Sequence, residues 1–164
     1  MEELDSGDPE FLVIENARLK ARAIDRPAGA MVIACDTDVV LDGEVLGKPR
    51  DAADARRYLD RMSGRGHTVM SGLVVLDEDG VERSGLERSE VVFKRIPEAE
   101  KQRYVDFGEW EGRSGGYAIQ TLGSSLVERL EGSVSNVVGL PVGLLARLAP
   151  ILFERSWCRL RPAS

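Results

Sequence analysis

The chain of 164 residues has little of what many metalloenzymes need, with one histidine, His67, and two cysteines, Cys35 and Cys158. A single histidine excludes a metal site built from several imidazoles, and the two cysteines are not in metal-ligand spacing. Any metal must therefore rest on oxygen ligands, which favours magnesium or manganese over zinc. So few cysteines fit a reduced, cytoplasmic setting, and one histidine gives no basis for a Ser-His-Asp arrangement.

Long apolar runs are also missing, since no stretch approaches the roughly 20 residues that span a bilayer. Residues 1–9 are acidic and no apolar region follows, so the start does not resemble a signal peptide. The chain has 22 Lys and Arg against 28 Asp and Glu, a net charge of −6. We therefore expect no membrane partner and no stable nucleic acid complex. A P-loop motif is absent too, although a few basic side chains in a cleft suffice to bind one nucleotide.

The length fits one domain with a real core. The first predicted element is a helix over residues 9–24, with Asp8 as N-cap and Pro9 at its first position. Its apolar stripe is expected to comprise Phe11, Ile14, Ala17, Ala21 and Ile24. A buried strand over residues 30–35 follows and is expected to stop at Asp36. A hairpin over residues 39–46, with Asp42-Gly43 at its turn, comes next.

The rest of the chain alternates further helices and strands. Predicted helices cover residues 51–62 and 97–107, and a last helix starts at Pro141. Predicted strands cover residues 68–76, the region around 81, residues 89–94 and residues 126–130, with a turn at 77–80 and a glycine-rich loop at 108–116. Such a mixture in one domain indicates an α/β or α+β fold.

Asp36 is the most informative position. A carboxylate at the end of a buried strand lies where α/β folds place ligand sites. Asp38 is two residues further on, and the two carboxylates share one face if the strand continues. Such a pair could hold a divalent metal or activate water. Judged on local sequence alone, a strand-end turn or a helix cap at Asp36 is the simpler interpretation.

Three further side chains suit a nucleotide. Lys20 and Lys48 could contact phosphate oxygens as compact point charges. Taken alone, Lys20 is more simply a solvated helix lysine, whereas the Gly47-Lys48-Pro49 turn fixes the direction of Lys48. Gln120 offers a donor and an acceptor for a base edge, although, taken alone, an ordinary flexible loop followed by a strand is the simpler interpretation of its region. His67 is interpreted as structural.

Four segments stand in order along the chain: ENARLKA, IACDTDVVLDGEVLGKP, GGYAIQ and EGSVSNVVGLP. Together they resemble the motifs of the Maf family of nucleoside triphosphate pyrophosphatases. The resemblance covers the chain to about residue 151. It implies a mixed α/β sheet flanked by helices, with a deep nucleotide-binding cleft, as in Maf and ITPase-like folds. It also implies a cytoplasmic enzyme, often a homodimer, that needs a divalent cation, Mg²⁺ or Mn²⁺.

The resemblance also implies roles for individual residues. Family members hydrolyse nucleoside triphosphates to the monophosphate and pyrophosphate, and the family was first named for inhibition of septum formation. By the motifs, Asp36 looks like the general base and a metal ligand. Lys20 and Lys48 look like phosphate contacts, and Glu3 looks like an acidic residue of the cleft. Thr37 and Gln120 look like the positions that select the base, in the pattern of the dTTP/UTP branch.

The chain also departs from the family pattern. Family members open with a strand and a loop carrying Ser, Pro and paired Arg, and we expect residues 1–164 to be a single domain lacking that strand-loop-helix segment. The common Asp-Lys-Ala before the glycine pair is Gly112-Arg113-Ser114, and Ser133 replaces an Asp. Because that first segment is absent, we expect reduced activity and stability. The alternative function is a catalytically impaired nucleotide-binding or cell-division regulatory remnant.

Overall fold

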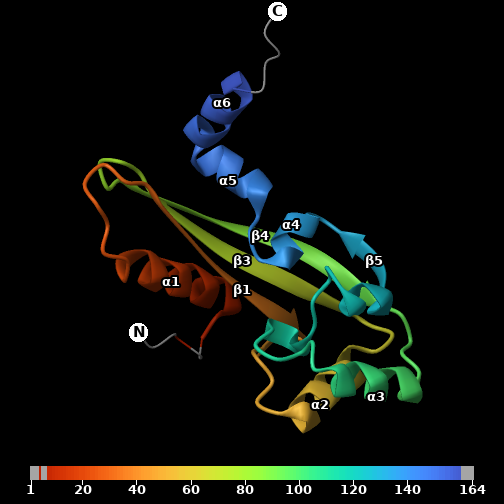
Figure 1. Cartoon of the computed structure of the whole chain (residues 1–164). Helices are drawn as coiled ribbons and strands as arrows, with labels where there is room; N and C mark the ends of the chain where they lie inside the picture. The colour runs from red at the N-terminus through yellow and green to blue at the C-terminus, as the bar shows by residue number, and fades with distance from the viewer. Residues whose placement is uncertain (1–3, 5–6, 160–164) are drawn as a thin grey trace, which may run out of the picture.

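The computed structural model describes residue 4 and residues 7–159, with side chains through residue 154 (Figure 1). The helices are α1 (Pro9–Arg22), α2 (Ala52–Met62), α3 (Glu98–Phe107), α4 (Val134–Val138), α5 (Val142–Leu148) and α6 (Pro150–Arg159). The strands are β1 (Val32–Leu41), β2 (Glu44–Leu46), β3 (Gly66–Leu76), β4 (Glu82–Phe93) and β5 (Val127–Glu131). Two 3-10 turns, Ser114–Gly116 and Leu122–Leu126, lie between α3 and β5.

The described strands form a five-stranded sheet in the order β2-β1-β3-β4-β5. The predicted α/β class is confirmed. The sheet itself is antiparallel at every pairing of these strands, where a mixed sheet was expected. The connections account for two of the four pairings, because β1 and β2 form a tight hairpin, as do β3 and β4, and tight hairpins join only antiparallel strands. The turn at Asp42-Gly43 was predicted correctly, with φ values of 55° and 81°.

Two strands are longer than the sequence indicated. β1 does not stop at Asp36 but continues to Leu41, because residues 32–40 pair with β3 along their whole length. The two short strands expected around 81 and 89–94 are one strand, β4, which pairs with β3 from Leu76↔Glu82 to Gly66↔Val92. In both places the neighbouring strand extends the element through residues that have weak strand propensity by themselves.

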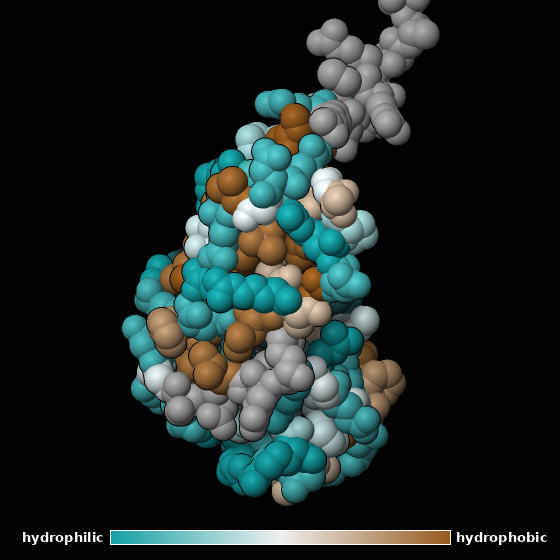
Figure 2. All heavy atoms as spheres, turned by 90° about the vertical axis from the view of Figure 1, so that its left-hand side faces the viewer, coloured by the Kyte–Doolittle hydropathy of each residue, from teal (hydrophilic) through white to brown (hydrophobic). Residues whose placement is uncertain are grey.

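Helices cover both faces of the sheet. On one face α1 buries Ala17 and Ala21 against Val32, Ala34 and Val74. On the other face α5 packs on Leu73 and Val75 through Leu144 and Leu145, while α2 and α3 close the largest core cluster around β1, β3 and β4. Figure 2 views the molecule from the left of Figure 1, and apolar side chains gather in the middle of that face between polar ones.

The inward face of α1 differs from the predicted stripe. Asp8 caps the helix as expected, since its carboxylate accepts a hydrogen bond from the Glu10 amide. The buried positions, however, are Leu12, Val13, Asn16, Ala17 and Ala21. Phe11 and Ile24 are instead 56% and 51% exposed. A helix lying flat on a sheet buries a broad face, and small residues at its centre allow the closest approach.

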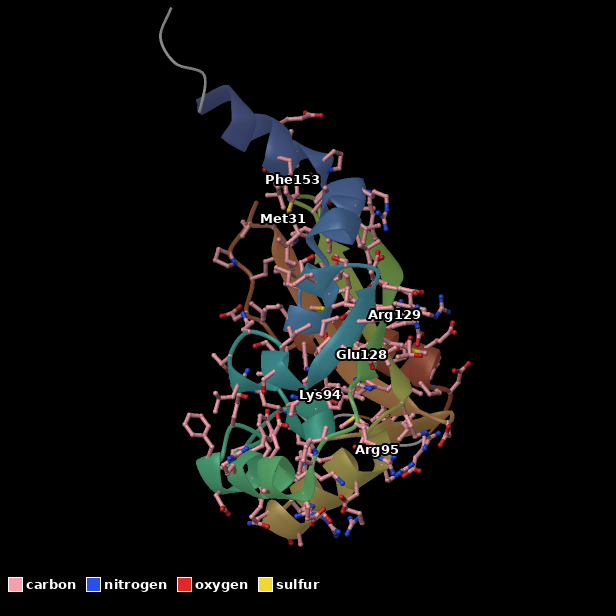
Figure 3. All side chains as sticks on the ribbon, turned by 90° about the vertical axis from the view of Figure 1, so that its right-hand side faces the viewer. Met31, Lys94, Arg95, Glu128, Arg129 and Phe153 are labelled. Atoms are coloured by element: carbon pink, nitrogen blue, oxygen red, sulfur yellow. The ribbon has the colours of Figure 1, made fainter. Side chains whose placement is uncertain are left out.

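The chain after β5 is more helical than predicted. The helix expected from Pro141 is α5, but it is not the last one, because α6 follows it directly. Met31 and Phe153, labelled in Figure 3, both pack against the cluster that Leu144 and Leu145 of α5 form with Leu73 and Val75. The short helix α4 was missed because its five residues give too brief a pattern. Within the described residues, no helix is long and apolar enough to cross a membrane.

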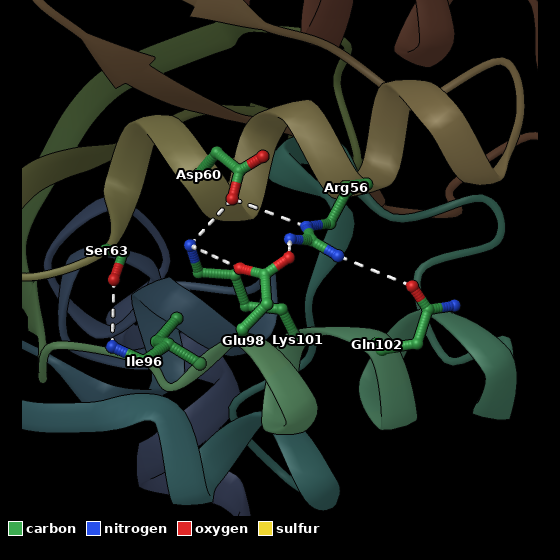
Figure 4. Close-up of polar contacts among 7 residues, drawn as sticks. All are labelled: Arg56, Asp60, Ser63, Ile96, Glu98, Lys101 and Gln102. Carbon is green, nitrogen blue, oxygen red and sulfur yellow. Dashed lines mark hydrogen bonds and ion pairs between the residues drawn. The ribbon is translucent and has the colours of Figure 1, made fainter.

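Ion pairs join α2 to α3 (Figure 4). Lys101 donates to Asp60 at 2.7 Å, and Arg56 pairs with Asp60 and Glu98. These contacts lower the pKa of Asp60, chiefly through the hydrogen bond from Lys101. The two helices therefore form one unit beneath the loop that leads into the candidate site.

Candidate functional site

A cavity of about 250 Å³ lies at the sheet edge where β1 extends beyond β2. Its wall comes from α1, β1, β3, the turn after β2, the glycine-rich loop and α4. The lining residues are Lys20, Cys35, Asp36, Thr37, Val39, Lys48, Val69, Gly112, Arg113, Ser114, Tyr117, Ala118, Ile119, Gln120, Val137, Val138 and Gly139. We call it the edge cavity. A smaller cavity of about 240 Å³ adjoins it and shares Asp36, Thr37 and Lys48.

The sequence-predicted residues converge on this cavity. Asp36, Lys20, Thr37, Lys48 and Gln120 all line it, although they come from four separate segments. Glu3, the remaining predicted residue, lies outside the described residues. The arrangement brings the residues together without assigning their roles, so the roles inferred from the resemblance stay predictions.

Asp36 and Lys20 form the most buried charged pair of the edge cavity. Asp36 is 8% exposed on the face of β1 that α1 covers, and the Lys20 ammonium donates to its carboxylate. α1 can deliver Lys20 there because Gly72 of β3 offers no side chain beneath the helix. An ammonium in direct contact fixes the orientation of a carboxylate through a charged hydrogen bond. Asp36 is therefore a carboxylate held in one position beside the cavity.

Thr37 points to the opposite face. Its hydroxyl lies 2.7 Å from that of Ser71, its cross-strand partner on β3. Ser71 in turn donates to the backbone oxygen of Asn136 in α4 at 3.5 Å. Asn136 is fully buried, and its amide donates to Val69 and Ser89. The hydroxyl of Thr37 is thus anchored to the sheet and to α4 through groups that the sequence reading did not single out.

The loop that carries Gln120 is fixed by a buried aromatic cluster. Tyr117 of this loop lies against His67 and Phe93, and its hydroxyl is 2.8 Å from His67 Nε2. Burial lowers the pKa of His67 to about 4 and raises that of the Tyr117 phenol, so both are neutral at pH 7. The structural role predicted for His67 agrees with this position. The partner could not be named from sequence, because it is 50 residues away.

The described residues contain no group of three His, Cys, Asp or Glu side chains that could hold a metal ion. Asp36 and Asp38 are the carboxylates of β1 nearest the edge cavity, and one oxygen of Asp38 accepts from the Ser114 hydroxyl at 2.9 Å. A site with one or two carboxylates is typical of magnesium, which completes its shell with water and substrate phosphates. The donor set therefore fits a cation that arrives with a phosphorylated ligand.

Taken together, the fold and the edge cavity define an α/β domain suited to a phosphorylated ligand. The ammonium groups of Lys20 and Lys48 and the guanidinium of Arg113 line one cavity with the carboxylate of Asp36. The chain belongs to the Maf-like protein family, whose model matches residues 1–150.

Named relatives agree with this membership. A protein named dTTP/UTP pyrophosphatase from Anaeromyxobacter dehalogenans (strain 2CP-C) is 48% identical over 143 residues, 85% of this chain and 72% of that protein. Proteins of the same name from Deinococcus radiodurans and Thermococcus gammatolerans are 43% and 40% identical, covering 90% and 93% of this chain and 75% and 82% of their own lengths. A nucleoside-triphosphatase (dITP/XTP pyrophosphatase) structure from Mycobacterium abscessus has a TM-score of 0.43 at 16% identity, covering 99% of this chain and 81% of that one. That likeness is too low to support an argument.

Proposed function

We propose that this protein is a nucleoside triphosphate pyrophosphatase that hydrolyses dTTP and UTP, or modified forms of them, to the monophosphate and pyrophosphate. The convergence of Asp36, Lys20 and Lys48 on one cavity is the observation that carries the proposal. The names of relatives that are 40% to 48% identical over most of the chain support the same activity.

In this proposal Asp36 acts as the general base. Its carboxylate accepts a proton from water as the water oxygen bonds to the α-phosphorus, and the bond from that phosphorus to the bridging oxygen breaks. Pyrophosphate leaves with the bond electrons. Lys20, in contact with Asp36, holds the carboxylate in place, and Lys20 and Lys48 neutralise charge on the phosphate oxygens.

A divalent cation, Mg²⁺ or Mn²⁺, would be held by Asp36, with Asp38 two residues along the same face of β1. When bound, it would neutralise part of the negative charge on the phosphate oxygens. The need for this cation, a homodimer and a cytoplasmic location all follow from the family resemblance and stay predictions.

Base selection is assigned to Thr37 and Gln120. A uracil or thymine ring presents one N–H donor between two carbonyl acceptors, whereas cytosine presents an acceptor beside an amino group. The hydroxyl of Thr37 and the amide of Gln120 each offer a donor and an acceptor. Their position in the edge cavity, beside the apolar side chains of Ile119 and Val137, suits a stacked pyrimidine.

The activity is tested on the purified chain with UTP, dTTP, CTP, ATP and GTP, in magnesium and in manganese, with products separated by ion-exchange chromatography. We expect UTP and dTTP to give the monophosphate and pyrophosphate in equal amounts. Release of orthophosphate from the triphosphate, or equal rates with all five nucleotides, would contradict the proposal.

The role of Asp36 is tested by Asp36→Asn. We expect kcat to fall about 10²–10⁴-fold, because a positioned general base typically contributes that much. Binding of α,β-methylene-UTP, which cannot be hydrolysed at the scissile position, should change little when it is measured without a divalent cation. Asp42→Asn is the matched control, since Asp42 is an exposed turn residue of the same hairpin whose left-handed backbone asparagine also adopts. Near-normal turnover by Asp36→Asn would exclude Asp36 as the base.

A further inference from the structure

Two cations of the edge cavity have no hydrogen-bond or ion-pair partner among the residues that the structure describes. The ammonium of Lys48 and the guanidinium of Arg113 both line the cavity and are exposed. Neither donates a hydrogen bond to, or forms an ion pair with, any residue that the structure describes, whereas Lys20 in the same cavity is paired with Asp36. The positive charge of Lys48 and Arg113 is therefore available to a ligand.

The backbone beside Arg113 is locked to the turn that carries Lys48. The hydroxyl oxygen of Ser114 lies 2.9 Å from an Asp38 carboxylate oxygen and 3.0 Å from the Leu46 carbonyl oxygen, and these two acceptors share its single proton. The same oxygen accepts from the Val39 amide at 3.2 Å. One residue further, the amide of Gly115 donates to the Gly47 carbonyl at 3.0 Å.

The loop is also pressed against the strand. Gly115 has φ of 69°, and a Cβ added there would lie 2.6 Å from a methyl carbon of Val39. Only glycine fits this close approach in a left-handed backbone. Hydrogen bonds and packing thus hold the Arg113 segment and the Lys48 turn as one wall of the cavity, so the backbones that carry the two cations are fixed relative to one another.

We propose that Arg113 is a substrate-binding residue that, with Lys48, contacts the β- and γ-phosphates, and that Ser114 is a positioning residue that holds it there. This inference rests on the proposed pyrophosphatase function. The pyrophosphate end is the most highly charged part of the substrate and must leave the cavity, which suits two exposed cations. A guanidinium binds two phosphate oxygens at once, whereas an ammonium acts as a point charge.

Arg113→Gln tests the contact by titration calorimetry with two separate probes, pyrophosphate and UMP, at one fixed magnesium concentration. We expect the Kd for pyrophosphate to rise about tenfold or more, because a lost charged hydrogen bond contributes that much. The Kd for UMP should stay within about twofold. Arg113→Lys should recover part of the loss. Arg103→Gln is the matched control, since Arg103 is exposed on α3 and lines a different cavity.

Ser114→Ala separates positioning from contact. We expect it to raise the Kd for pyrophosphate about threefold with UMP unchanged, and Ser114→Thr, which keeps the hydroxyl, to restore it. Wild-type pyrophosphate affinity in Arg113→Gln, or equal losses for pyrophosphate and UMP, would overturn the assignment of Arg113 while leaving UTP hydrolysis by the wild type unaffected. A wild-type protein that binds neither pyrophosphate nor α,β-methylene-UTP would overturn the proposed function as well.

Discussion

Gly72→Ala tests how closely α1 must approach the sheet. Gly72 lies on β3, between β1 and β4, directly beneath the helix. A Cβ added to it would lie 2.3 Å from the Val13 carbonyl oxygen, 2.4 Å from the Val13 carbonyl carbon and 2.5 Å from the Ile14 nitrogen. All three atoms belong to helix backbone, so no side-chain rotation relieves the clash. Either α1 lifts or β3 bends.

The expected cost follows from this geometry. Overpacking a core typically costs about 1–3 kcal/mol, and a clash with backbone on a central strand belongs at the upper end, at about 3 kcal/mol. For a domain of this size each kcal/mol lowers the melting temperature by about 2–4 °C, which gives a fall of roughly 6–12 °C. Strand propensity alone would make alanine more stable than glycine at this position by about 0.5–1 kcal/mol. The effect expected from the clash therefore has the opposite sign.

Thermal and urea unfolding of the wild type and of Gly72→Ala measure the loss of stability. Steady-state kinetics with UTP give a second measurement. Lifting α1 moves Lys20 away from Asp36, so the KM for UTP should rise together with the loss of stability. Gly66→Ala on the same strand is the control, because its Cβ would lie an ordinary 3.8 Å from Val92. A Gly72→Ala protein that melts with the wild type would refute the close approach on which this reasoning depends.

Two further predictions concern titrating groups. Burial lowers the pKa of His67 in the folded protein to about 4. As the pH falls below about 6.5, the unfolded chain therefore binds a proton at His67 before the folded protein does, and the free energy of unfolding of the wild type falls. His67→Gln should abolish this part of the pH dependence. The loss reaches about 2 kcal/mol by pH 5, and equal pH dependence of unfolding in the two proteins would contradict it. Lys101→Met should cost under about 1 kcal/mol at pH 7, because Asp60 is 47% exposed. Lys101 lowers the pKa of Asp60, so this difference should shrink below about pH 4, and a difference that persists at pH 3 would show that packing causes it.

Local signals in the sequence were sufficient to predict the elements whose ends are marked by capping or turn residues. Asp8 and Asp51 cap α1 and α2 through the hydrogen bonds that their residue types predict. Asp42-Gly43 fixes the hairpin, and Gly108 ends α3 in a left-handed conformation. In each case the deciding interaction joins residues close in sequence, so it is visible without the fold.

Tertiary pairing decided the elements that the sequence reading missed. The Asp-Thr-Asp run after residue 35 has the composition of a turn, yet pairing with β3 holds it extended. The burial of Leu12 and Val13 rather than Phe11 depends on where Gly72 lets the helix approach.

The same distinction holds for the edge cavity. Its motif residues could be chosen from sequence, and those that the structure describes do line it. The supporting contacts could not be chosen: Ser114 binds Asp38 and Leu46 across 76 and 68 residues. Ser71 likewise holds Thr37 across 34 residues. Such partners have no short-range signature, because only the sheet register brings them together.

The alternation of side chains along β1 explains how one cavity can serve two kinds of recognition. Asp36 and Thr37 are consecutive residues of an extended strand, so their side chains leave opposite faces of the sheet. Asp36 meets Lys20 of α1 on one face, and Thr37 meets Ser71 on the other. In the proposed enzyme the phosphates therefore bind on the α1 side and the base binds on the α4 side, so base preference can change without disturbing the residues around Asp36.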